Sequence, residues 1–86
     1  MSRMIPAAER ITRARALIQK ARDLPVPAGL GRHDFSYIAQ VKAILQEARD
    51  LVKFIPNTPS ATAEIKNEVA KIFQEADQAN KDIFYR

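Results

Sequence analysis

Residues 34–55 are DFSYIAQVKAILQEARDLVKFI, and their apolar side chains recur at the spacing of an α-helix. The apolar positions lie mostly three or four residues apart, at Tyr37, Ile38, Val41, Ile44, Leu45, Ala48, Leu51, Val52 and Ile55. This face is wider than the seam of a coiled coil, so we expect the segment to contact two neighbouring helices. Asp34 is a suitable N-cap, and Pro56 is expected to stop the helix.

Two further amphipathic segments flank this one and are predicted to be helical over about 6–24 and about 59–84. The first has its apolar face at Ile11, Ala14, Leu17, Ile18, Ala21 and Leu24. Pro25 and Pro27 end it, because the residue before a proline avoids helical dihedrals. The second is expected to begin with Thr58 as N-cap and Pro59 at the first helical position. Its apolar face lies at Ala61, Ile65, Val69, Ile72, Phe73, Ala76, Ala79 and Ile83.

Helices joined by short connections tend to pack antiparallel, so the sequence predicts an all-α fold, a small up-down-up three-helix bundle. No two-residue alternation is long enough to indicate a strand. With 86 residues there is room for one domain, covering 1–86. The third helix is the longest, and we expect it to overhang its partners by about a turn that carries Ile83, Phe84 and Tyr85.

One segment of the first predicted helix is closely matched in the second. Residues 16–24 are ALIQKARDL and residues 43–51 are AILQEARDL, with a weaker match, IFQEAD, at 72–77. In each copy the glutamine is expected to face water and the small alanine to lie in the apolar stripe. Duplication of an ancestral helix would explain the match. Convergence is the favoured explanation, because solvated amphipathic helices draw on the same few residues.

The residues that commonly carry catalysis or bind metals are scarce. The chain has no cysteine and one histidine, His33, which cannot assemble a zinc site from His and Cys ligands. Gly29 and Gly31 precede a predicted helix but lack the strand and third glycine of a dinucleotide-binding motif. Arg32 would favour the binding of phosphate at the N-terminus of the predicted helix 34–55, but the negative charge of the N-cap Asp34 opposes it. The sequence therefore predicts no cofactor, no metal and no enzymatic activity.

The net charge of +4 is concentrated in the first part of the chain. Residues 1–33 carry seven Lys and Arg against two Asp and Glu, whereas residues 34–86 carry seven against eight. On a helical wheel, Arg13 and Lys20 lie along one edge of the first apolar stripe, and Arg15 and Arg22 lie along the other. Such cations either cover the flanks of a buried stripe or face an anionic partner. We favour the first interpretation, because the rows point to opposite sides and no aromatic residue is interleaved with them.

These patterns predict a non-catalytic module for protein–protein interaction or assembly, whose partner is another protein or a second copy of the chain. The candidate contact residues are two terminal aromatics and four cations: Phe84, Tyr85, Arg13, Arg15, Lys20 and Arg22. Phe35 and Phe54 also fall outside the main stripe of 34–55. The alternative is a weakly specific nucleic-acid-binding protein that uses the basic first helix.

The sequence also bears on where the protein acts. No apolar run approaches the roughly 20 residues that span a bilayer, and we expect a cytoplasmic protein. The Arg-rich first segment resembles a mitochondrial transit peptide in outline, but Glu9 and Asp23 count against that interpretation.

Overall fold

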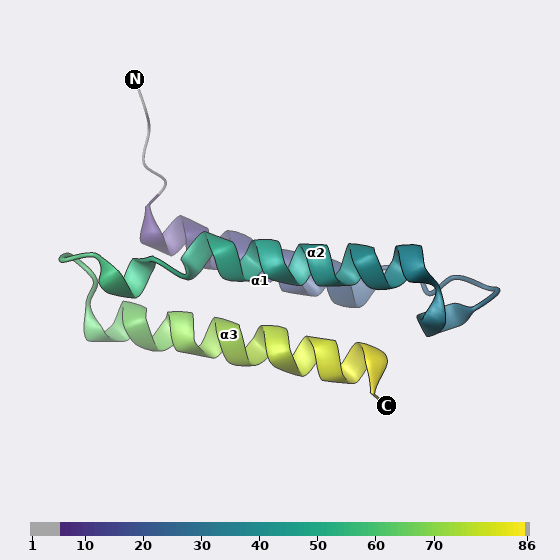
Figure 1. The fold of residues 1–86 in the computed structure, drawn as a ribbon. Coiled ribbons are helices and arrows are strands. Elements are labelled where there is room, and N and C mark those ends of the chain that lie inside the picture. The colour runs from purple at the N-terminus through teal and green to yellow at the C-terminus, as the bar shows by residue number, and fades with distance from the viewer. Residues whose placement is uncertain (1–5, 86) are drawn as a thin grey trace, which may run out of the picture.

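Three α-helices run up, down and up along one axis in the computed structural model, which describes residues 6–85 (Figure 1). They are α1 (Ala7–Asp23), α2 (Phe35–Val52) and α3 (Ala63–Phe84), joined through the short 3₁₀ helices η1 (Gly31–His33) and η2 (Ile55–Asn57). Each α-helix packs against the other two. No strand occurs within 6–85. The all-α three-helix bundle predicted from the sequence is therefore confirmed.

The proline-bearing connection between α1 and α2 ends the first helix where the sequence predicted. Leu24, which precedes Pro25, has left the helical region with φ −60° and ψ 131°. Gly31 begins η1 at φ +59°, a left-handed conformation that glycine adopts without a steric penalty. The carboxylate of Asp34 then accepts a hydrogen bond from the backbone N–H of Tyr37 at 3.0 Å, which confirms Asp34 as the N-cap of α2.

The start of the third helix differs from the sequence-based prediction. The helix begins at Ala63 rather than near 59, and its N-cap is Thr62, whose hydroxyl accepts from the N–H of Ile65 at 3.1 Å. The expected cap, Thr58, instead donates its hydroxyl back to the carbonyl of Ile55 at 2.7 Å. Thr58 therefore closes η2, and the chain turns once more before α3.

The prediction that the third helix overhangs its partners was also wrong, because this helix starts later than expected. Because α3 starts later, it has 22 residues instead of the 26 that 59–84 would have given it. Its last turn lies beside the start of α2, where the ring of Phe84 packs edge-on against that of Tyr37 with centroids 6.2 Å apart. Ile83 and Phe84 are accordingly half-buried against the core, and Tyr85 remains exposed.

The core combines a few large aliphatic side chains with many alanines. Leu45 and Ile72 are the largest of the fully buried side chains. The fully buried alanines come from all three helices: Ala14, Ala21, Ala48, Ala76 and Ala79. Small side chains at these contacts let the helix axes approach closely. The core therefore lies along the contact line of the three helices.

The repeated segments of α1 and α2 occupy equivalent environments. Their alanines, Ala21 and Ala48, are fully buried, and both glutamines are exposed. Each glutamine donates to the aspartate four residues later, from Gln19 to Asp23 at 2.9 Å and from Gln46 to Asp50 at 3.0 Å. The placement of glutamine and alanine predicted from the sequence is confirmed. The repeated residues therefore have the same roles in both helices, with the alanine in the buried face and the glutamine in the solvated face.

We expect Leu45→Ala to lower the free energy of unfolding by about 2–5 kcal/mol, because it removes a buried side chain and leaves a cavity between three helices. Urea unfolding followed by circular dichroism measures this cost. Glu47→Ala, on the exposed face of α2, is the control and should change stability by less than about 0.5 kcal/mol. A Leu45 variant as stable as the parent would contradict the assigned core.

Candidate partner-binding surface

Arg15 of α1 is held by two carboxylates of α3. Its Nη2 donates to Oε2 of Glu68 at 2.6 Å, and its Nε donates to Oε2 of Glu75 at 3.3 Å. The hydrogen bond from Arg15 is the main reason that the pKa of Glu68 lies below its usual value. This side chain of the predicted basic row therefore ties α1 to α3.

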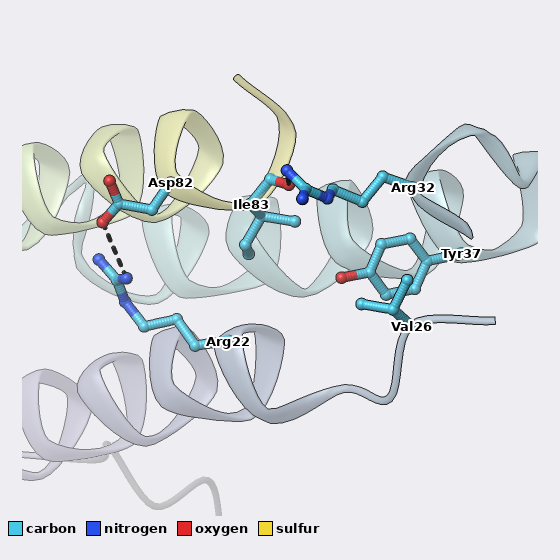
Figure 2. A pocket seen from close by; sticks show the side chains of 6 residues that line it. All are labelled: Arg22, Val26, Arg32, Tyr37, Asp82 and Ile83. Atoms are coloured by element: carbon cyan, nitrogen blue, oxygen red, sulfur yellow. Dashed lines mark hydrogen bonds and ion pairs between the residues drawn. The ribbon is translucent and has the colours of Figure 1, made fainter. Parts of the chain in front are cut away.

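Arg22 makes a second ion pair between the same two helices. Its Nη1 donates to Oδ2 of Asp82 at 3.0 Å, as the dashed line in Figure 2 shows. The corresponding arginine of α2, Arg49, donates to Asp77 of α3 at 3.1 Å. Both repeated segments thus present an arginine to an aspartate of α3, from α1 and from α2 respectively. Arg15 and Arg22 thus lie at the flank of the buried stripe of α1, and their guanidinium groups pair with α3.

Arg13 and Lys20 lie on the other side of α1, as the helical wheel predicted. Arg13 forms an ion pair with Glu9 at 2.9 Å on the same helix. Both side chains border a shallow groove between α1 and α2, which has a volume of about 350 Å³ and also contains Leu17, Glu47 and Leu51. The carboxylate of Glu47 lies in the same groove. An anion is therefore attracted there less strongly than by Arg13 and Lys20 alone.

The structure gives the two terminal aromatics different environments. Phe84 is half-buried against Tyr37, and the ammonium of Lys42 lies 5.6 Å from the centre of its ring. Tyr85, the next residue, is 74% exposed. Phe84 therefore stabilises the end of the bundle, and Tyr85 is the one whose ring is open to a partner.

A groove that was not identified from the sequence lies at this end of the bundle. It has a volume of about 620 Å³ and is lined by Arg32, His33, Ile38, Lys42, Phe84 and Tyr85. These residues come from η1, α2 and the end of α3, and they are brought together because the Phe84–Tyr37 contact closes α3 against α2. Three of the six are basic, and none is acidic.

A smaller hollow of about 220 Å³ adjoins this groove and shares Arg32 with it. Figure 2 shows Arg32 reaching from the connection toward α3, where its Nη1 lies 3.5 Å from the carbonyl oxygen of Ile83. Val26 and Tyr37 form the opposite wall of the hollow (Figure 2). The two depressions therefore meet at Arg32.

Most of the exposed large apolar side chains belong to the same end. Val26 and Leu30 lie in the connection between α1 and α2, Phe35 begins α2, and Tyr85 follows α3. Phe35 is 85% exposed, the most of this set. Phe54, at the opposite end of the bundle, is also exposed and borders an apolar hollow of about 280 Å³. Phe35 and Phe54 thus lie outside the core, as their positions on the helical wheel predicted.

The described part of the chain has no group of three or more histidine or acidic side chains placed to hold a metal ion. His33 is exposed beside the groove. None of the helices within 6–85 is both long enough and apolar enough to cross a membrane.

No family model, curated protein or solved structure shows significant similarity to this chain. The end surface formed by the groove, the adjoining hollow and the exposed side chains around them is the strongest candidate site.

The Arg15–Glu68 pair makes stability depend on pH. Because the folded state lowers the pKa of Glu68 from its usual 4.5, folded chains release this proton more readily than unfolded ones. The stabilisation is present above about pH 5 and is lost as pH falls through the lowered pKa of the folded state. We expect Glu68→Gln to have a lower Tm at neutral pH and a smaller loss of Tm between about pH 5 and pH 3 than the parent.

Thermal unfolding at a series of pH values measures this difference. The control is Glu47→Gln on α2, because the carboxylate of Glu47 forms no ion pair with the described residues. The Tm of this variant should change with pH as the Tm of the parent does. Parallel acid profiles for Glu68→Gln and the parent would show that the pair does not stabilise the fold.

Proposed function

We propose that this protein is a non-catalytic interaction module, which binds a partner protein through the end of the bundle where the α1–α2 connection meets the C-terminus of α3. The supporting observation is that most of the exposed large apolar side chains belong to elements at that end, namely Val26, Leu30, Phe35 and Tyr85. Exposed apolar side chains gathered at one place are typical of protein contact sites, whereas single ones are common on any surface.

The mixture of side chains at this end also favours a protein partner. Tyrosine, phenylalanine and arginine are enriched at protein interfaces, because each combines a large contact area with few rotatable bonds or with several hydrogen-bond donors. Tyr85, Phe35 and Arg32 are all exposed at the end surface. A second copy of the chain is one partner that this surface would accept.

A nucleic-acid-binding role for α1 has less support. Arg13, Arg15 and Arg22 already pair with carboxylates of the protein, so binding phosphate would require these ion pairs to be broken. Lys20 is the one cation of the two rows without an ion pair among the described residues. One cation gives only a weak attraction to a phosphate backbone.

The proposed interface predicts a specific loss of association. We expect the double variant Phe35→Ser/Tyr85→Ser to lose partner capture or self-association while keeping its helical circular dichroism signal, because both side chains lie outside the core. The two measurements are sedimentation equilibrium of the purified chain and quantitative mass spectrometry of proteins that co-purify with it from nuclease-treated lysate. Tyr85 is preferred here to Phe84, whose loss would also disturb its packing on Tyr37.

Phe54→Ser provides the matched control, since it removes an exposed phenylalanine from the opposite end of the bundle. It should leave both measurements unchanged. Association that survives the double variant, or that Phe54→Ser abolishes instead, would rule out the end surface as the contact.

The nucleic-acid alternative predicts a different result in titrations with duplex and single-stranded DNA. We expect affinity no tighter than about 10⁻⁵ M near physiological salt, the non-specific range. Arg15→Gln/Arg22→Gln should leave that weak affinity nearly unchanged and lower the Tm, because it removes the ion pairs to α3. Arg13→Gln/Lys20→Gln should change the Tm much less. Sub-micromolar, salt-sensitive binding that either double variant abolishes would favour the nucleic-acid function instead.

A further inference from the structure

The 620 Å³ groove at the end of the bundle gathers basic side chains that pair with no carboxylate of the described residues. Arg32 and His33 come from η1 and Lys42 from α2, and no lining residue is acidic. Within 6–85, none of these three side chains forms an ion pair with a carboxylate. A depression lined by one sign of charge concentrates ligands of the opposite sign.

Other unpaired cations of the bundle lie in different surroundings. Lys20 borders a groove that also contains the carboxylate of Glu47. Arg10 is the sole charged residue beside the apolar hollow at the opposite end. The groove beside the C-terminus of α3 instead combines Arg32 and Lys42 and has no acidic lining residue, so charge complementarity favours an acidic ligand there.

The geometry of Arg32 suits a carboxylate. Its single side-chain hydrogen bond within the described residues is the long donation to the Ile83 carbonyl at 3.5 Å. A guanidinium has five N–H donors in a planar fork, so four remain for a ligand. Two parallel donors of this fork match the two oxygens of a carboxylate, a pairing stronger than one between neutral groups.

The apolar part of the groove favours a peptide over a nucleic acid. The ring of Phe84 is half-buried against Tyr37, and the ammonium of Lys42 lies 5.6 Å from its centre, so this ring is poorly placed to stack on a base. Ile38 adds an aliphatic surface. Base recognition relies on successive aromatic faces, of which only Tyr85 remains exposed here. A peptide with an aliphatic side chain between acidic residues fits this lining better than a nucleic acid does.

We infer that the groove lined by Arg32, His33, Ile38, Lys42, Phe84 and Tyr85 binds a short acidic segment of the partner protein, with one aliphatic side chain seated against Ile38 and Phe84. This rests on the proposed interaction function and names the chemistry of the partner. The volume of the groove is within the range of small-ligand sites and accommodates a few residues. The affinity should be weak, on the order of 10⁻⁵ to 10⁻⁴ M, and sensitive to salt.

The test is fluorescence anisotropy of the full chain with a fluorescein-labelled peptide in which glutamates flank a single leucine. We expect saturable binding that is lost near 1 M salt, where charges are screened beyond roughly 3 Å. Replacing the glutamates of the peptide by glutamines should abolish binding, and replacing its leucine by glycine should weaken it. Amide chemical-shift mapping should place the largest changes at Arg32, His33 and Lys42.

Variants of the groove complete the test. Arg32→Gln/Lys42→Gln should bind the peptide at least about tenfold more weakly, since it removes two charge-assisted contacts. Lys42→Arg keeps the charge and should retain most of the affinity. Lys20→Gln/Lys66→Gln removes the same charge from exposed positions outside the groove and should bind like the parent. Circular dichroism of each variant checks that the bundle still folds.

Three results would overturn the inference: no saturable binding of the acidic peptide, equal loss of affinity in the two double variants, or tighter binding of a single-stranded oligonucleotide of the same charge. These results are distinct from failure of the proposed function. If Phe35→Ser/Tyr85→Ser abolishes association but Arg32→Gln/Lys42→Gln does not, the end surface is an interface and its ligand is not acidic.

Discussion

Alanine at the contacts between helices is the constraint on which the rest of this structure depends. Five alanines are fully buried, and they occupy positions where α1, α2 and α3 face one another. Close approach of the helix axes brings the flanking side chains within reach of the neighbouring helix. Arg15, Arg22 and Arg49 can therefore meet carboxylates of α3 at 2.6–3.3 Å. With bulkier residues at these contacts, the same arginines would extend into water.

The helical spacing was sufficient to predict the fold, because each segment has one continuous apolar face. Ile11, Val41 and Leu45 were placed on such faces, and all three are buried. The start of α3 could not be predicted in the same way, since Thr58 and Thr62 are both plausible caps. Whether a threonine caps forward or bonds back to the preceding turn depends on the geometry of η2, which local propensity does not specify.

The candidate site could be predicted only in part. Tyr85 was identified because it was expected on an overhanging end of the third helix; the overhang is absent, but Tyr85 is exposed because it follows the last turn of α3. The groove beside it was missed, since Arg32 and Lys42 are ten residues apart and neither belongs to a charged run. They line one groove because Phe84 packs on Tyr37, a contact between residues 47 positions apart in the chain. The basic rows of α1, by contrast, were predicted as candidate contact residues, but Arg15 and Arg22 pair with carboxylates of α3.

The last turn of α3 has a further consequence for how such a module would respond to a partner. Terminal helical turns open locally at a lower free-energy cost than the global unfolding of a domain. Here that turn supplies Phe84 and Tyr85 to the groove, and it is tied down by the contact with Tyr37 and the Arg22–Asp82 pair. A ligand that requires the closed turn would suppress its fraying by mass action. Occupancy of the groove and order at the end of α3 are then thermodynamically linked, so the most easily opened part of the bundle reports on binding.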